Sequence, residues 1–170
     1  MTFPLLPAMM LILFGLCLSH LALSQPPSYG DLSAETQVVG ERYMQAYIAR
    51  DWDVLADFVA ESATFSDPTA TMVFGQVLQQ GKSAMMANFR SGYASITHMQ
   101  FHPQRTFFAG DRAVFEGTLD WDLTLQNDAV VRTRAMPFVT ILTVTDGKVQ
   151  EHTDYADYQP FLDAYQAANP

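Results

Sequence analysis

The chain has 170 residues, 49% of them hydrophobic, and a formal net charge of −9. This length and composition fit one ordinary domain with a buried core. The nine lysines and arginines are scattered, which argues against binding to nucleic acid or to an anionic membrane, because both need basic patches.

Residues 1–24 have the features of a signal peptide. They contain no lysine, arginine, aspartate or glutamate, and the run from Leu5 to Leu23 is almost wholly apolar. Small residues at Ala22 and Ser24 fit a cleavage site before Gln25. We therefore expect a secreted or periplasmic protein that has no membrane contact after cleavage. Two alternatives remain open: an uncleaved membrane anchor, since about 20 apolar residues can span a bilayer, and a buried core helix.

The single cysteine, Cys17, lies inside this segment. A cleaved chain would have no thiol, so disulfides, thiol catalysis and cysteine metal sites are excluded for it.

Residues 25–32 are expected to form a linker and residues 33–170 the domain. Ser33 can cap a first helix, and Asp51 can cap a second, short one. Apolar and aromatic side chains recur at helical spacing on one face of the first helix: Val39, Tyr43, Ala46 and Tyr47. In the second helix, Trp52, Leu55 and either Phe58 or Val59 are expected to face inward.

The segment 63–67 predicts a short strand that stops at Pro68, followed by irregular residues 69–80. A third helix is predicted from about Lys82 to Arg90. From Phe115 to Leu125 the side chains alternate as in a strand, and the chain returns through residues 129–144. Asp146 and Gly147 indicate a tight hairpin, and the last strand is predicted from Lys148 to about Tyr158. Helices followed by a meander of strands are typical of an α+β fold.

The turn at Asp146 and Gly147 leaves the register of its hairpin open. A three-residue turn would place Thr140 opposite His152, and a two-residue turn would place Ile141 there. On the neighbouring hairpin, we expect Asp122 opposite Arg132 and Asp120 opposite Arg134, as structural charge pairs.

Several short motifs resemble one known family when they are taken in order. They are Arg42-Tyr43-Met44, Ala49-Arg50-Asp51-Trp52, Ala63-Thr64-Phe65-Ser66-Asp67-Pro68, Gly81-Lys82-Ser83-Ala84, Val144-Thr145-Asp146-Gly147-Lys148-Val149 and His152-Thr153-Asp154-Tyr155-Ala156-Asp157. Over about residues 36–162 this pattern resembles the nuclear transport factor 2-like superfamily, in its SnoaL-like and ketosteroid isomerase-like branch. The resemblance implies a cone-shaped, curved antiparallel sheet wrapped by about three N-terminal helices. It also implies a pocket for a small hydrophobic organic molecule.

By this resemblance, Asp67 matches the general base of the isomerases and Tyr43 matches the tyrosine that donates to the substrate oxyanion. A carboxylate that loses solvation beside an apolar pocket is suited to moving protons. The alternatives are a turn role for Asp67 before Pro68 and a core role for Tyr43. Where the isomerases carry a protonated aspartic acid, this chain has Thr140 or Ile141. This departure counts against efficient steroid isomerisation.

His152 and Asp154 share one face of the last predicted strand. By resemblance, Asp154 matches the water-activating carboxylate of limonene epoxide hydrolase-like enzymes, and together the two side chains would form an acid–base pair. Those enzymes also use an arginine two residues before a second aspartate, but Thr118 precedes Asp120 here. A structural role for His152 and for Asp154 is the alternative.

The residues expected to contact the ligand are Thr140, Trp52, Phe65 and Phe138. No metal site is expected, because His98 and His102 would lie about 13 Å apart on a strand. No nucleotide-binding glycine loop, nucleophile elbow or metal motif is present, so we expect no cofactor.

Three functional interpretations remain. The first is an acid–base isomerase, cyclase or hydrolase that acts on a small hydrophobic molecule. The second is a non-catalytic module that binds a small ligand. The third is a homodimer formed through an apolar sheet face that includes Leu119, Trp121, Val139 and Ile141. Fold alone does not choose among them.

Overall fold

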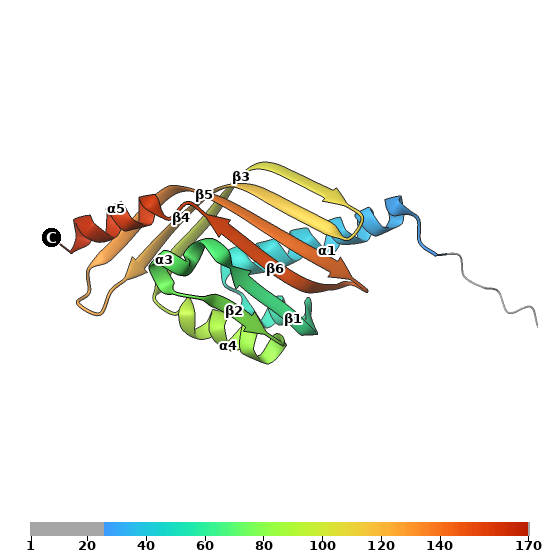
Figure 1. Ribbon diagram of the computed structural model, residues 1–170, viewed down its shortest axis with the longest axis horizontal. Helices are drawn as coiled ribbons and strands as arrows, with labels where there is room; N and C mark the ends of the chain where they lie inside the picture. The colour runs from blue at the N-terminus through green and yellow to red at the C-terminus, as the bar shows by residue number, and fades with distance from the viewer. Residues whose placement is uncertain (1–25, 170) are drawn as a thin grey trace, which may run out of the picture.

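The computed structural model describes residues 26–169, whose strands form one curved six-stranded sheet in the order β2-β1-β6-β5-β4-β3 (Figure 1). The strands are β1 (Val59–Asp67), β2 (Val77–Gln80), β3 (Ile96–Ala109), β4 (Arg112–Thr124), β5 (Val130–Thr145) and β6 (Lys148–Ala156). The expected sheet was antiparallel throughout, but β1 and β6 pair in parallel, so the sheet is mixed. The expected α+β class is confirmed.

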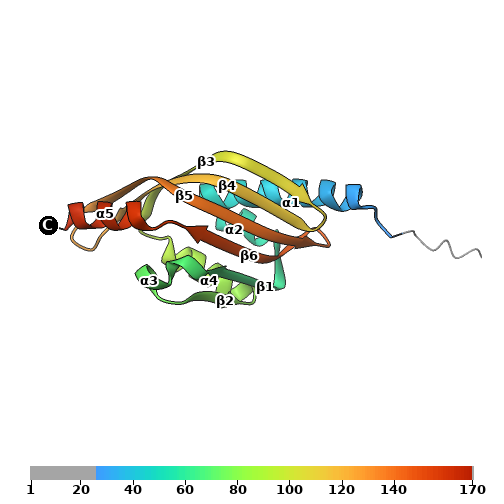
Figure 2. The same cartoon turned by 45° about the horizontal axis from the view of Figure 1, so that its top comes forward.

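Five α-helices and one 3₁₀ turn complete the described chain. They are α1 (Tyr29–Ala49), α2 (Trp52–Ala56), the 3₁₀ turn η1 (Pro68–Ala70), α3 (Thr71–Phe74), α4 (Lys82–Gly92) and α5 (Gln159–Ala168). Helix α1 contacts β3, β4 and β5, whereas α4 contacts β1 and β2 and α5 contacts β5. Figure 2 shows α1 and α2 behind the sheet and α4 beside β1 and β2. No helix within residues 26–169 is long and apolar enough to cross a bilayer.

The first helix begins earlier than the sequence suggested. Ser28 caps α1 in a capping box, in which its hydroxyl accepts from the Asp31 N–H and the Asp31 carboxylate accepts from the Ser28 N–H. Ser33, the expected cap, instead accepts a hydrogen bond from the Gly110 N–H and ties α1 to the β3–β4 turn. The expected linker therefore ends at residue 28, and the predicted signal peptide, with Cys17, lies outside the described residues.

The predicted inward face of α1 is confirmed, since Val39, Tyr43, Ala46 and Tyr47 are all buried. Asp51 caps α2 as expected, by accepting from the Val54 N–H. The segment 69–80 is more regular than predicted, because it contains α3 and the edge strand β2. Helix α5 was not predicted; it follows a last strand that ends two residues before Tyr158.

Neither expected register of the last hairpin is correct. The turn has two residues, with Thr145 paired to Lys148 and Val144 to Val149. A β-bulge then adds Gln150, so that Leu142 lies opposite His152 and Thr140 lies opposite Asp154. The bulge shifts the alternation by one residue and turns both His152 and Asp154 into the core.

The β4–β5 charge pairs also differ from expectation. Asp122 lies opposite Arg132, as predicted, but its carboxylate pairs with Arg134 at 2.5 Å. Asp120 lies at a second bulge and accepts from the Ala135 N–H and from His102. The bulge moves Arg134 along the strand and explains the exchange of partners.

The four residues proposed for a dimer surface do not share a face of the sheet. Leu119 and Trp121 are buried on the core side. Val139 and Ile141 alternate with the buried Phe138, Thr140 and Leu142 of β5 and therefore point to the opposite side. These residues cannot form one continuous surface.

Candidate functional site

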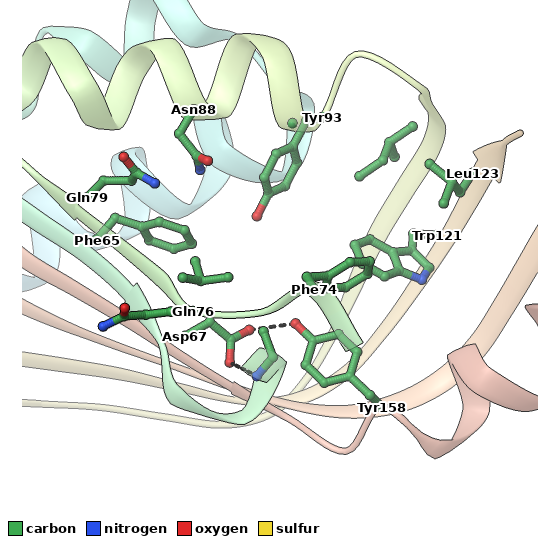
Figure 3. Close-up of a pocket in the computed structure, with 14 residues that line it drawn as sticks. Phe65, Asp67, Phe74, Gln76, Gln79, Asn88, Tyr93, Trp121, Leu123 and Tyr158 are labelled. Carbon is green, nitrogen blue, oxygen red and sulfur yellow. Dashed lines mark hydrogen bonds between the residues drawn. The ribbon is translucent and has the colours of Figure 1, made fainter. Parts of the chain in front are cut away.

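A pocket of about 330 Å³ opens between the end of β1, the C-terminal end of α4 and the start of α5 (Figure 3). Aromatic and aliphatic side chains make most of its wall, with three side-chain amides and one carboxylate. The lining residues that carry the later argument are Phe65, Asp67, Phe74, Tyr93, Trp121 and Tyr158. Such a concave, mainly apolar site with a few polar groups is typical of small-molecule binding.

Asp67 is held in place by hydrogen bonds at the end of β1. Its Oδ1 accepts from the Thr69 N–H at 2.9 Å, the Ala70 N–H at 2.9 Å and the Thr69 hydroxyl at 2.6 Å. Its Oδ2 accepts from the Tyr158 hydroxyl at 2.5 Å. Asp67 thus has the turn role before Pro68 that was the alternative expectation for it. Its carboxylate also lines the pocket.

Two tyrosine hydroxyls accompany Asp67 at the pocket. Burial, followed by the hydrogen bond to Asp67, raises the pKa of Tyr158 far above its ordinary value of 10.0. Burial, followed by the negative charge of Asp154, raises the pKa of Tyr93. Both phenols therefore remain protonated near neutral pH and act as hydrogen-bond donors.

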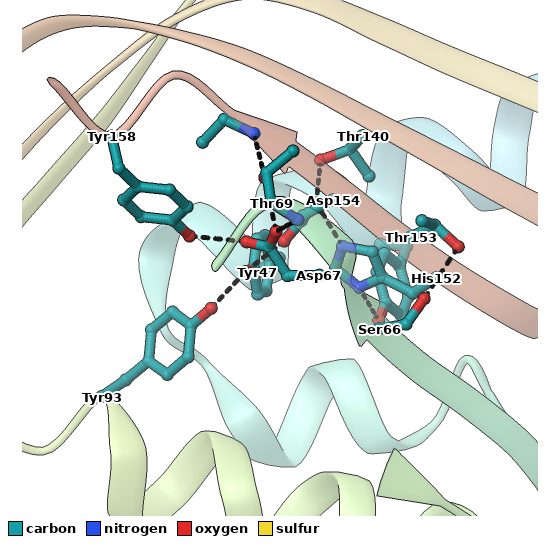
Figure 4. Close-up of polar contacts among 12 residues, drawn as sticks. Tyr47, Ser66, Asp67, Thr69, Tyr93, Thr140, His152, Thr153, Asp154 and Tyr158 are labelled. Carbon is teal, nitrogen blue, oxygen red and sulfur yellow. Dashed lines mark hydrogen bonds and ion pairs between the residues drawn. The ribbon is translucent and has the colours of Figure 1, made fainter. Parts of the chain in front are cut away.

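A fully connected polar cluster lies behind the pocket wall (Figure 4). The Tyr43 hydroxyl lies 2.8 Å from His152 Nδ1, and His152 Nε2 lies 2.8 Å from Asp154 Oδ1. Asp154 Oδ1 also accepts from the Thr140 hydroxyl at 2.6 Å, and Oδ2 accepts from the Tyr47 hydroxyl at 2.9 Å. All five residues are buried, none of them more than 2% exposed.

The proton count of this cluster sets the direction of its hydrogen bonds. An ionised carboxylate only accepts, so the single Tyr47 proton is used on Asp154. Tyr93, whose oxygen is 2.5 Å from that of Tyr47, must then donate to Tyr47. The Tyr93 oxygen therefore presents lone pairs to the pocket, and the chain from Tyr93 through Tyr47 connects the pocket to Asp154.

The structure separates the predicted site residues into two groups. Asp67 and Phe65 line the pocket. Tyr43, His152, Asp154 and Thr140 do not line it, because they hydrogen-bond to one another in the core behind it. Trp52 stacks on Phe89 with ring centroids 5.4 Å apart, and Phe138 packs against Phe101, so both belong to the core instead of the pocket wall.

Three important tyrosines were missed as site residues. Tyr47 is one helical turn after Tyr43 and was assigned to the core on that spacing alone. Tyr93 follows the end of α4, and Tyr158, which was predicted as the approximate end of the last strand, precedes α5. No local motif indicates a functional tyrosine next to the end of a helix, so only the fold brings Tyr93 and Tyr158 to the pocket that Asp67 lines.

Within the described part of the chain, no group of three histidine, cysteine, aspartate or glutamate side chains is arranged to hold a metal ion. His102 Nε2 lies within hydrogen-bond distance of the Asp120 carboxylate, at 3.2 Å.

The curved sheet, its covering helices and the pocket at its open end define the nuclear transport factor 2-like class of α+β proteins. A solved protein provisionally named a SnoaL-like polyketide cyclase, from Shewanella denitrificans OS-217, has a TM-score of 0.69 to this chain. It is 20% identical, and the match covers 78% of this chain and 97% of that one.

Two further solved structures have the same fold. An epoxide hydrolase of the LEH-like type from M. tuberculosis has a TM-score of 0.62 and 14% identity, with 80% of this chain and 92% of that chain covered. A protein provisionally named a ketosteroid isomerase, from Kribbella flavida DSM 17836, has a TM-score of 0.55 and 19% identity, with 74% and 79% covered. At these identities the likeness shows the fold alone.

The family model for the SnoaL-like domain matches residues 40–152. The chain therefore belongs to the SnoaL-like domain family, and the family predicted from the short motifs is confirmed. None of the curated proteins compared with the chain matches it.

Proposed function

We propose that this protein is a cofactor-independent acid–base enzyme, an isomerase, cyclase or hydrolase, that acts on a small and largely apolar molecule. The observation that carries the proposal is Asp67, a residue only 5% exposed whose carboxylate lines a pocket with otherwise neutral walls. We further propose that the chain is exported and that residues 1–24 direct it.

Asp67 is assigned the role of general base. Its Oδ1 is occupied by three donors, whereas Oδ2 has a single donor, Tyr158, and retains a lone pair for a substrate proton. The three bonds at Oδ1 fix the orientation of the carboxyl group, which keeps Oδ2 toward the ligand. Before proton transfer, the hydrogen bond from Tyr158 would stabilise the ionised form of Asp67. After transfer, Tyr158 would stay beside the protonated carboxyl group.

Tyr93 is assigned a polar contact to the same ligand. The Tyr93 hydroxyl donates its hydrogen bond to Tyr47, so the Tyr93 oxygen can accept a hydrogen bond from the ligand. The buried His152–Asp154 pair would then act through Tyr47 and Tyr93 by fixing the direction of these hydrogen bonds, and not by touching the substrate.

Isomerisation of cyclohex-3-enone and hydrolysis of cyclohexene oxide test the proposal with two simple probes. Asp67→Asn should lower the rate by about 10²–10⁴-fold if Asp67 is the base. Glu61→Gln is the matched control, because Glu61 lies on the same strand with its side chain 90% exposed. Turnover that is equal in Asp67→Asn and Glu61→Gln would remove Asp67 from the mechanism.

A non-catalytic binding module is the second candidate. It is favoured by the complete burial of His152, which leaves only one ionisable acid–base group, Asp67, on a pocket wall otherwise made of neutral side chains and two phenols. Tight ligand binding without turnover of any bound compound would support this alternative.

A further inference from the structure

The negative charge of Asp67 has no positive partner in the part of the chain that the structure describes. The residue is 5% exposed, and its carboxylate takes part in no ion pair among residues 26–169. A buried charge is costly, and proteins normally pair it with an opposite charge. Hydrogen bonds from Thr69, Ala70 and Tyr158 solvate the carboxylate but leave its charge uncompensated.

The rest of the pocket also favours positive charge. No lysine, arginine or histidine is among its lining residues. Asn88, Gly92 and Tyr93 line it from the C-terminal end of the eleven-residue helix α4, where the helix dipole is negative. The protons of the Tyr93 and Tyr158 hydroxyls are already donated to Tyr47 and Asp67, so both oxygens offer only lone pairs to a ligand.

Five aromatic rings surround the same space: Phe65, Phe74, Tyr93, Trp121 and Tyr158 (Figure 3). Phe74 contacts two of the other four, with ring centroids 5.6 Å from Tyr158 and 6.5 Å from Trp121. Aromatic faces carry a negative quadrupole and attract organic cations, most strongly where water is excluded. An ammonium ion with apolar substituents can interact favourably with both these rings and the carboxylate.

We propose that the pocket selects an organic cation, a protonated or quaternary amine with apolar substituents, whose charge lies beside Asp67. This inference rests on the proposed function, because both require a ligand next to this carboxylate. It goes further by specifying that the ligand is positively charged. The aromatic rings hold the substituents, and the net charge of −9 attracts the cation toward the protein.

Two probes of the same shape separate charge from apolar contact. Benzyltrimethylammonium and neopentylbenzene differ only in a positive nitrogen in place of a carbon atom. Their binding to the purified protein can be followed by tryptophan fluorescence, because Trp121 lines the pocket. We expect the cation to bind at least about tenfold more tightly than the neutral compound. Equal affinity, or tighter binding of neopentylbenzene, would overturn the inference while leaving the pocket as a ligand site.

Three variants locate the charge that is responsible. Asp67→Asn should weaken the cation at least about tenfold and leave neopentylbenzene unchanged. Glu61→Gln removes the same charge from an exposed site on β1 and should change neither affinity. Tyr158→Phe keeps the carboxylate and should keep the preference for the cation. Loss of the preference for the cation in Glu61→Gln, or its survival in Asp67→Asn, would contradict the assignment to Asp67. Binding of neither probe would also contradict it and would remove the proposed ligand pocket.

Discussion

Replacing Asp154 by asparagine removes a buried charge while it keeps the shape of the side chain. Three donors point at this carboxylate, from His152, Thr140 and Tyr47, at 2.8, 2.6 and 2.9 Å. A hydrogen bond to a charged group contributes about 1.5–3 kcal/mol, against about 0.5–1.5 kcal/mol for a neutral one. With the amide nitrogen at the Oδ2 position, Tyr47 loses its acceptor; with the nitrogen at the Oδ1 position, both His152 and Thr140 lose theirs. We therefore expect Asp154→Asn to lower the free energy of unfolding by about 4 kcal/mol.

The assay is urea unfolding at pH 7, followed by tryptophan fluorescence. A loss of this size is a large fraction of the total stability of about 5–15 kcal/mol that is usual for a domain. Asp146→Asn is the matched control, because Asp146 is exposed at the turn of the same hairpin with φ 53°, a conformation that asparagine tolerates. It should change stability by less than about 0.5 kcal/mol. Equal midpoints for the two variants would refute an ionised Asp154 as the acceptor for all three donors.

Two further perturbations test the packing. Burial, followed by the negative charge of Asp154, raises the pKa of Tyr43 and Tyr47 well above 10.0, so the native state holds protons that the unfolded state loses above about pH 10. Stability should be constant up to that pH and then fall by about 1.4 kcal/mol per pH unit for each tyrosine, and urea unfolding between pH 9 and 11 measures the slope. A flat profile would show that these hydroxyls are not buried. Gly117→Ala should cost at least about 2 kcal/mol, because its new Cβ would lie 2.1 Å from the His102 carbonyl oxygen, whereas Gly30→Ala has no contact nearer than 3.6 Å and should be neutral or stabilising. An equal effect of the two glycine substitutions in thermal unfolding would contradict this reading of the β3–β4 contact.

The local parts of the fold could be predicted because they depend on neighbouring residues. The helical spacing of Tyr43 and Tyr47, the cap at Asp51 and the turn at Asp146 each follow from a few positions along the chain. The strand alternation around Phe115 is equally local.

The parts that failed depend on contacts between distant segments. The bulge at Gln150 has no sequence signal, yet it decides which face His152 and Asp154 occupy. The parallel pairing of β1 with β6 depends on where the chain goes between them. Asp67 was found through its motif with Pro68, whereas Tyr93 and Tyr158 join it only because the fold brings the segments after α4 and β6 to the same pocket.

The residues that shape the pocket are unequally divided along the chain. The stretch that defines the family ends at residue 152, whereas Tyr158 and the whole of α5 come after it. This last segment supplies the hydrogen-bond donor to Asp67 Oδ2 and, through Phe161, packs against Phe74 and Trp121 at the pocket wall. The shape of the pocket therefore depends on a segment outside the matched stretch, so a change confined to Tyr158 and α5 alters the ligand site while the sheet stays the same.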